Sequence, residues 1–362
     1  MTVHLLNHIG KPQVEALPEG EFQKEIEAVL GIAERWQAGQ EEFVLRTSGS
    51  TGAPQAMTFS RKQLKRSARQ TSVAFGIEAG DSALLCLPLR YVAGFMMVIR
   101  ALHLGLHLYV EPARRLVAQQ ASPKVDLAAL LPMQLESSWD AAGRWPPALA
   151  AAKAVLLGGA PVPEALALRL RDEAPVPVYH TYGMTETLTH VAVRRLDGRH
   201  QTEVFSALSG VRFSTDARNC LVVNNPVTEA PVVTNDQVRL LDDQRFRYLG
   251  RIDNVVNSGG LKLQLEEVEA QCGSVLRASG WLQPGQPFFA FAVPDAELGQ
   301  RLELAIELRA EVRAGHAEAI RETLRQRMPR HHAPRAVHLL TNFQYTETSK
   351  IDRLGTVRLV EK

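Results

Sequence analysis

The chain has 362 residues, of which 45% are hydrophobic and 22% are charged, and its formal net charge is +2. These values suit a globular protein with room for two domains, and they give no reason to expect a nucleic-acid or anionic-membrane surface. Three widely spaced cysteines argue against a disulfide framework or a zinc site, and no apolar run approaches the ~20 residues that span a bilayer. The first residues, Met1 to His4, lack a signal-peptide pattern, so we expect a cytoplasmic protein without membrane insertion.

Helix and strand patterns alternate through the first half of the chain. Apolar residues at helical spacing predict helices over 22–36, from about 61, over 91–104 and over 163–173. Short apolar runs predict buried strands at 43–45, 83–87, 106–110, 154–157 and 176–179. Strands that alternate with helices predict a parallel sheet whose ligands lie at the carboxyl ends of its strands.

The pattern changes in the second half. Residues 204–249 show short strands separated by turns, and a smaller α/β unit follows, with a strand at 288–293 and a helix at 315–328. We therefore predict an α/β fold with a large N-terminal domain, residues 1–250, of parallel-type sheets and helices plus a small β-rich subdomain. Residues 251–362 are expected to form a small α+β C-terminal domain.

Residues 46–54, Arg-Thr-Ser-Gly-Ser-Thr-Gly-Ala-Pro, are the most informative segment, because everything between the arginine and the proline is small or hydroxylic. Glycines let the backbone approach a ligand, and hydroxyl and backbone N–H donors suit an anion. No Gly-Lys-Ser/Thr follows, so the segment is not a Walker loop. A flexible surface loop has the same composition, and the segment alone leaves both interpretations open.

Later segments follow in a fixed order. They are Leu-Gly-Gly-Ala-Pro at 157–161, Tyr-Gly-Met-Thr-Glu-Thr at 182–187, Gly-Arg-Ile-Asp-Asn at 250–254, Ser-Gly-Gly-Leu-Lys at 258–262 and Ser-Lys-Ile-Asp-Arg at 349–353. Each segment alone is explained by a turn, a helix cap or a solvated charge pair. Their order and spacing together are typical of one superfamily.

Together the segments resemble the adenylate-forming superfamily of acyl-CoA synthetases, peptide-synthetase adenylation domains and luciferases, from about Arg46 to Arg353. Within it, residues 87–102 are similar to the o-succinylbenzoate–CoA ligases of menaquinone synthesis. The resemblance implies an acid–thiol ligase that makes an acyl-adenylate and pyrophosphate from a carboxylate and ATP. The thiol of coenzyme A (CoA) then displaces AMP.

The resemblance also implies the residues that hold ATP and Mg²⁺. Hydroxyl and backbone donors for the β- and γ-phosphates are Thr47, Ser48, Gly49, Ser50, Thr51 and Gly52. The adenine and ribose side comprises Gly159, Ala160, Tyr182, Gly183, Thr185, Asp236 and Arg251. Tyr182 is expected to stack on adenine and Asp236 to accept from the ribose hydroxyls, although a core aromatic and a turn cap remain alternatives. Glu186 is expected to anchor Mg²⁺, and Lys350 to act as the catalytic cation at the α-phosphate.

Arg100 carries the substrate argument, because an arginine at the end of an apolar helical run is costly to bury without a partner. Its guanidinium is expected to capture the second carboxylate of succinylbenzoate, with Thr189 and Met96 as weaker candidates for the same pocket. The alternative is a charge that complements the helix dipole.

The small domain is expected to be mobile, because it carries residues for both half-reactions. Lys350 serves adenylation, whereas the family passes the pantetheine arm at Gly259 and Gly260, so Asp253 at the boundary is the expected hinge.

Two positions depart from the superfamily pattern. Gln55-Ala56 replaces the usual Lys-Gly after proline, and Ser349 replaces the glycine before the lysine. A ligase for another aryl or acyl acid and a non-catalytic nucleotide-binding relative therefore remain alternatives. The expected partners are a carboxylic acid, ATP and CoA, without nucleic acid, and the sequence leaves a homodimer open.

Overall fold

The computed structural model describes residues 3–6, 11, 21–46, 55–120, 123–139, 143–283, 285–308, 315–345 and 351–360. Its contacts divide the chain into two compact units. Unit 1 comprises residues 1–214, 222–233 and 240–247, and unit 2 comprises 215–221, 234–239 and 248–362. The division into residues 1–250 and a mobile 251–362 stays a prediction, and the units are described separately below.

The core of unit 1 is a mostly parallel sheet in the order β1-β5-β4-β6-β7-β8-β9-β10. The strands β5, β4, β6, β7 and β8 pair in parallel, as the alternating pattern predicts, although β6 itself is not among the predicted strands. The strand β1 forms an antiparallel edge. Their bounds are β1 Val3–Leu6, β4 Ser82–Leu85, β5 His107–Val110, β6 Leu127–Leu130, β7 Ala154–Leu157, β8 Val178–Gly183, β9 His190–Arg195 and β10 Val204–Ala207.

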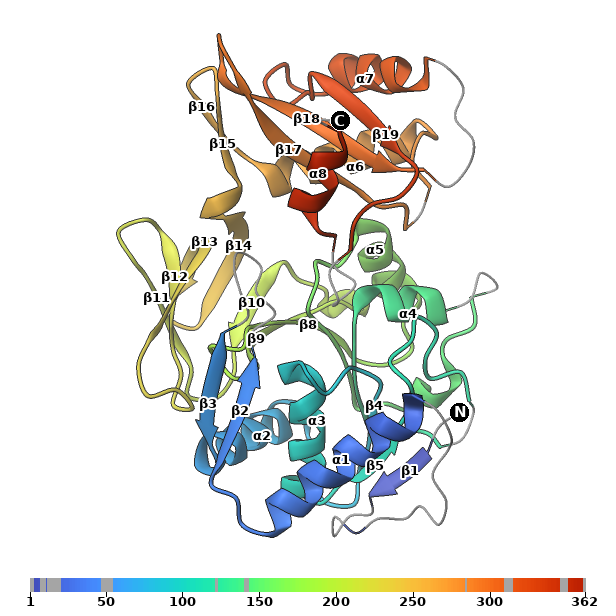
Figure 1. Cartoon of the computed structure of the whole chain (residues 1–362), viewed down its shortest axis with the longest axis vertical. Coiled ribbons are helices and arrows are strands. Elements are labelled where there is room, and N and C mark those ends of the chain that lie inside the picture. The colour runs from blue at the N-terminus through green and yellow to red at the C-terminus, as the bar shows by residue number, and fades with distance from the viewer. Residues whose placement is uncertain are drawn as a thin grey trace. The chain divides into compact units, whose positions relative to one another are not determined.

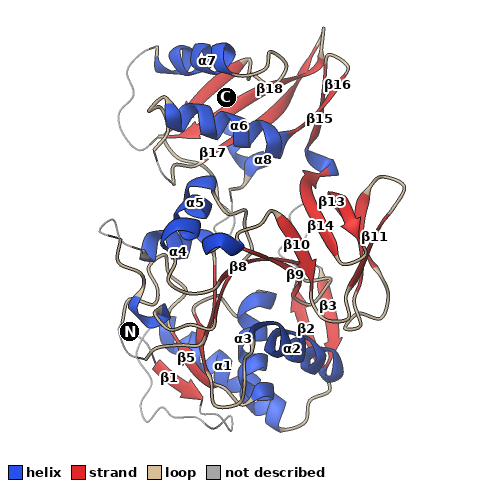
Figure 2. Cartoon of the chain, turned by 180° about the vertical axis from the view of Figure 1, so that it is seen from behind, coloured by secondary structure: helices blue, strands red, loops and turns tan. Residues whose placement is uncertain are grey.

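Helices cover both faces of this sheet (Figures 1 and 2). One face packs against α1, α2 and α3 in a single apolar cluster, and the other packs against α4 and α5. The bounds are α1 Glu21–Gln37, α2 Arg61–Phe75, α3 Val92–Leu104, α4 Pro132–Ser138 and α5 Glu164–Glu173, with 3₁₀ turns η1 Pro147–Leu149 and η2 Gly198–His200. The predicted helices of this region are confirmed, whereas α4 was not predicted because it spans only 132–138.

The β-rich region is confirmed between residues 204 and 251. The sheet continues from β10 to β14, β13, β12 and β11 in that order, and these strands are divided between the two units. The bounds are β11 Arg212–Thr215, β12 Cys220–Asn224, β13 Val232–Asp242 and β14 Arg245–Arg251. A separate hairpin pairs β2 Glu42–Arg46 with β3 Ala56–Ser60, so the predicted strand at 43–45 gains a partner that the sequence pattern did not reveal.

Unit 2 contains a second sheet in the order β16-β15-β18-β17, with β19 parallel to β18. One face packs against α6 and α7, and the other carries Phe289, Phe291 and Phe343 with residues of α8. The bounds are β15 Val255–Ser258, β16 Leu261–Gln264, β17 Phe288–Asp295, β18 Gly299–Glu307, β19 Ala336–Leu340, α6 Leu265–Ala278, α7 His316–Arg327, α8 Arg353–Val360 and the turn η3 Ile252–Asn254. The predicted strand at 288–293 and helix at 315–328 are thereby confirmed.

All three cysteines are buried and free of disulfide bonds. Within the described ranges, no helix is both long enough and apolar enough to cross a bilayer.

Candidate active site

The carboxyl ends of β7 and β8 bring two of the predicted segments to the same edge of the sheet. The two strands are parallel neighbours with Leu157 opposite His180, so the turn at 158–160 and the segment from Tyr182 onward both follow that edge. This is where a parallel sheet is expected to hold a ligand.

Tyr182 is half-buried and packs edge-on against two aromatic rings, one from β10 and one from β14. Its ring centroid lies 5.9 Å from that of Phe205 and 5.2 Å from that of Phe246. Gly183 follows, and a Cβ there would lie 2.2 Å from the backbone oxygen of Thr189. The glycine is therefore required by the close approach of β8 and β9, whatever its contact with a nucleotide.

The segment after Gly183 is held by hydroxyl groups. Thr187 accepts from the backbone N–H of Met184 at 3.0 Å and donates to the backbone oxygen of Thr189 at 2.7 Å. Thr185 is buried, whereas Glu186 is exposed in the same turn.

A magnesium ion fits this turn only with additional oxygen ligands. Among the described residues, no group of three His, Cys, Asp or Glu side chains could hold a metal ion. Glu186 supplies a hard carboxylate oxygen, so phosphate oxygens and water would have to complete the shell, as is usual for Mg²⁺ bound with a nucleotide.

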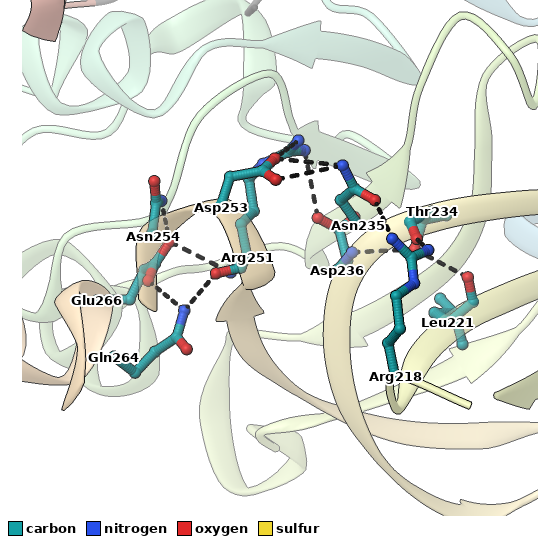
Figure 3. Close-up of polar contacts among 10 residues, drawn as sticks. All are labelled: Arg218, Leu221, Thr234, Asn235, Asp236, Arg251, Asp253, Asn254, Gln264 and Glu266. Carbon is teal, nitrogen blue, oxygen red and sulfur yellow. Dashed lines mark hydrogen bonds and ion pairs between the residues drawn. The ribbon is translucent and has the colours of Figure 1, made fainter. Parts of the chain in front are cut away.

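Asp236 lies within β13, buried with only 6% of its surface exposed. The turn-cap alternative is therefore wrong. The Thr234 hydroxyl fixes this part of the strand, since it accepts from the backbone N–H of Asp236 at 3.1 Å and donates to the Leu221 oxygen at 2.8 Å. Figure 3 shows this contact at one end of a longer polar network.

The network connects Asp236 to the predicted hinge residue. Arg251 donates through Nη1 to Asp236 at 3.4 Å and through Nη2 to Asp253 at 2.7 Å (Figure 3). Burial disfavours the charge on Arg251, but the hydrogen bond to Asp253 and the charges of both carboxylates outweigh it and raise the pKa of the guanidinium. Asn235 donates to both Asp253 oxygens at 3.3 Å, and Arg218 in turn donates to the Asn235 oxygen at 3.0 Å.

Two side chains, from β16 and from the start of α6, hydrogen-bond to the backbone of Arg251. The Gln264 amide donates to the Arg251 carbonyl at 2.9 Å, and the Glu266 carboxylate accepts from the Arg251 N–H at 3.4 Å. Gly250 has a φ of +148°, and a Cβ there would lie 2.1 Å from the Gln264 nitrogen. The motif glycine thus gives Gln264 the space to reach the backbone.

Arg100 is the largest of the fully buried side chains, with 2% of its surface exposed. Its Nε donates to the Thr71 hydroxyl at 3.0 Å, whereas its Nη2 has no hydrogen-bond partner among the described residues. Burial lowers its pKa to about 10, so the side chain remains cationic at neutral pH. His103, and not Arg100, is the basic residue in the last turn of α3, so the helix-dipole alternative lacks support.

Polar side chains from α2 and β9 surround this charge. His190 lies 3.3 Å from the Thr71 hydroxyl, and burial together with Arg100 lowers its pKa well below its ordinary value. The Thr189 and Ser67 hydroxyls are 3.0 Å apart and buried beside them. Met96 is fully buried in α3. The structure thus adds Thr71, a helix residue without a motif around it, to the predicted set.

Gly259 and Gly260 form the two-residue turn between β15 and β16. Ser258 pairs with Leu261, and the glycines have φ values of +57° and +81°. A hairpin turn with two positive φ values favours glycine by itself.

Several predicted residues lie outside the described part of the chain. They are Thr47, Ser48, Gly49, Ser50, Thr51, Gly52 and Lys350. Their assignments stay predictions.

Comparison with known proteins identifies the family of the chain. The model of the family "AMP-binding enzyme" matches residues 8–252. A crystal structure of an "acyl-CoA synthetase (AMP-forming)/AMP-acid ligase II-like protein" from Dyadobacter fermentans is 34% identical, with a TM-score of 0.61 and 99% of both chains covered. The chain belongs to the AMP-binding enzyme family.

Relatives within the family include named ligases. The 2-succinylbenzoate–CoA ligase of Escherichia coli is 30% identical over 71% of this chain, and the chain spans 59% of its length. The chain spans 41% of the corresponding Enterococcus faecalis ligase. O-succinylbenzoate Coenzyme A Synthetase (MenE) from Bacillus subtilis, solved with ATP and magnesium ion, is 19% identical with a TM-score of 0.68. The match covers 87% of this chain and 69% of that one, and it shows a shared fold.

Proposed function

We propose that this chain joins o-succinylbenzoate to CoA through an acyl-adenylate, with ATP and Mg²⁺. The observation that carries the proposal is the buried Arg100 guanidinium, whose Nη2 has no hydrogen-bond partner among the described residues. Family membership and the similarity to named succinylbenzoate ligases support the same reaction.

A buried cation is costly unless a partner compensates it. Removal of a charged group from water costs several kcal/mol in real proteins. An ionised carboxylate of the substrate would supply the missing partner by a charge-assisted hydrogen bond. Succinylbenzoate has two carboxylates, so one can remain ionised at Arg100 while the other is activated.

The first step joins the activated carboxylate to the nucleotide. A carboxylate oxygen attacks the α-phosphorus of ATP, the new O–P bond forms, and the bond to pyrophosphate breaks. Lys350 would offset the negative charge that develops on the α-phosphate, and residues 47–52 would hold the departing phosphates. Mg²⁺, held in part by Glu186, would neutralise phosphate charge when bound. Asp236 would fix the ribose and Tyr182 the adenine.

The second step transfers the acyl group. The CoA sulfur attacks the acyl carbon and loses its proton to water, and the C–S bond forms. The bond between the acyl carbon and the phosphate oxygen breaks, and AMP leaves with that oxygen. We propose that the pantetheine arm of CoA passes the Gly259–Gly260 turn. The C-terminal domain would change its orientation between the two steps at the hinge residue Asp253.

ATP–pyrophosphate exchange tests the proposal directly. We expect exchange with o-succinylbenzoate and much weaker exchange with benzoate, a fatty acid, or 4-oxo-4-phenylbutanoate, which lacks only the ring carboxylate. CoA should then convert the accumulated adenylate to a thioester that mass spectrometry detects.

The other outcomes separate the alternatives. Preferred exchange with a monocarboxylic acid would reject the succinylbenzoate assignment and leave an acid–CoA ligase. ATP binding without exchange for any acid would indicate a non-catalytic relative.

A further inference from the structure

The outward face of α2 carries positive charge without a carboxylate to balance it. Lys62, Arg66 and Arg69 recur at helical spacing on one exposed stripe, and Val73 continues this stripe with 71% of its surface exposed. No Asp or Glu occurs between residues 43 and 77. Because the whole chain has a formal net charge of only +2, these cations are a local concentration of charge.

The contacts of the three cations leave their charge available to a partner. Arg66 donates to the backbone oxygen of Pro226 at 3.0 Å, which does not neutralise the guanidinium. The side chains of Lys62 and Arg69 form no hydrogen bond or ion pair with any residue that the structure describes. All three positive charges of the stripe are therefore uncompensated.

The arginines of α7 show how an exposed helix ordinarily balances such charge. Arg321 pairs with Glu318, and Arg325 pairs with Glu322, each within one turn of the same helix. Nothing equivalent occurs on α2, because the helix contains no acidic residue.

A histidine of α3 reports the positive field beside the stripe. Burial lowers the pKa of His103, and the charges of Arg69, Lys65 and Arg61 lower it further. Lys65 and Arg61 also lie beside the Trp36 ring, at 6.0 and 3.9 Å from its centroid. The positive potential thus extends from the stripe to the side of α2 that faces α1.

The charge and composition of this face favour one class of partner. A second copy of the same face would bring cations against cations. The helix cannot enter a membrane surface by its apolar side, because Leu64, Ala68 and Phe75 are buried within unit 1. A phosphate backbone would make no use of the exposed Val73. A protein segment that carries carboxylates and an apolar side chain matches both parts of the stripe.

We propose that the outward face of α2 is a docking surface for an acidic, amphipathic segment of a partner protein. Carboxylates of that segment would pair with Lys62, Arg66 and Arg69, and an apolar side chain would cover Val73. The inference does not depend on the proposed ligase function.

Fluorescence anisotropy with a labelled helical peptide tests this surface. The acidic probe is an alanine-rich peptide of about 16 residues, with glutamates at every third or fourth position and one leucine on the same face. A second peptide has lysines in place of the glutamates. We expect the wild-type chain to bind the acidic peptide and not the lysine peptide, and binding should weaken between ~20 and ~150 mM salt.

Substitutions on the stripe should change this binding in a defined order. Lys62→Gln combined with Arg69→Gln should raise the dissociation constant of the acidic peptide roughly three- to thirtyfold, since two exposed ion pairs are lost. Val73→Ser should raise it about two- to fivefold, because apolar burial is lost. Lys62→Glu combined with Arg69→Glu should reverse the preference between the two peptides.

Arg321→Gln combined with Arg325→Gln is the matched control, because these arginines are already paired on their own helix. This variant should bind the acidic peptide as the wild-type chain does, and thermal unfolding shows that each variant is folded. The inference is overturned if the wild-type chain does not bind the acidic peptide, or if the stripe variants bind it equally well. Tighter binding to phosphatidylglycerol vesicles or to a DNA duplex than to the acidic peptide would also overturn it, in favour of a membrane or a nucleic acid.

Discussion

At the scale of single residues, Arg100 brings a positive charge into a place where the described residues do not neutralise it. A neighbouring ionisable group, His190, becomes cationic on protonation, and its pKa is lowered well below the ordinary value by burial and by Arg100. His190 is therefore neutral near pH 7, and the Arg100 guanidinium, which shares the Thr71 hydroxyl with it, is the group that favours an anionic ligand at this point.

Arg100→Met separates a binding role from a structural one. We expect kcat/KM for o-succinylbenzoate to fall about ten- to a hundredfold, because a charge-assisted contact is worth about 1.5–3 kcal/mol. The KM for ATP should change little. The variant should use 4-oxo-4-phenylbutanoate at least as efficiently as the wild-type chain does. Stability should be equal or higher, since an apolar side chain replaces an uncompensated buried charge. Steady-state exchange kinetics and thermal unfolding measure both effects.

Arg69 offers a control for this substitution, because it is an exposed arginine on α2. Arg69→Met should leave the kinetics with both acids unchanged. If Arg100→Met loses activity equally with the diacid and the analogue, and also loses stability, Arg100 supports the fold and does not bind substrate.

At the scale of elements, β13 places a carboxylate where a strand would ordinarily carry an apolar side chain. Thr234, Asp236 and Val238 alternate on the buried side of the strand. The Thr234 hydroxyl joins β12 to β13 through the Leu221 oxygen and also fixes the backbone of Asp236. The position of Asp236 therefore depends on its strand neighbour.

Thr234→Val should weaken recognition of the ribose. Valine keeps the shape but removes the hydroxyl, so the Asp236 carboxylate loses part of its alignment. We expect the preference for ATP over 2′-deoxy-ATP in the exchange reaction to fall roughly three- to tenfold, whereas Thr234→Ser should retain it. Thr215→Val, at an exposed position in β11, is the control. An unchanged nucleotide preference in a folded Thr234→Val variant would show that Thr234 does not position Asp236.

Sequence patterns predicted four of the five parallel strands, β4, β5, β7 and β8, because buried strands between helices are nearly continuous apolar runs. They missed the parallel strand β6, and they also missed β3, whose residues alternate in exposure and include no strong apolar run. The motif residues Asp236 and Arg251 could be predicted to lie near each other, whereas Asp253 was predicted only as a hinge and not as a partner of Arg251. The contributions of Arg218 and Asn235 could not be predicted. Arg218 contacts Asn235 only in the folded chain, and an asparagine in the sequence is explained equally well by a turn.

At the scale of the whole molecule, the two half-reactions place different demands on the C-terminal region. Lys350 is expected at the α-phosphate during adenylation, whereas the Gly259–Gly260 turn is expected to admit the pantetheine arm. Asp253 lies between β14 and β15, and it is held by Arg251 and Asn235. A change of orientation at this residue would have to break or exchange these contacts.

Asp253→Pro should therefore slow one half-reaction much more than the other, because proline fixes φ and restricts the preceding residue.

Lys350→Ala should divide the reaction into its two steps. The lysine would stabilise charge that develops on the α-phosphate only during adenylation, so exchange should fall to background. The variant should still convert supplied succinylbenzoyl-AMP to the thioester at close to the wild-type rate, since that step forms a C–S bond without pyrophosphate release. Single-turnover assays of each step measure the two rates, and Lys124→Ala, at an exposed lysine before β6, serves as the control. A folded Lys350→Ala variant that loses both steps to the same extent would show that the lysine does not act in adenylation alone.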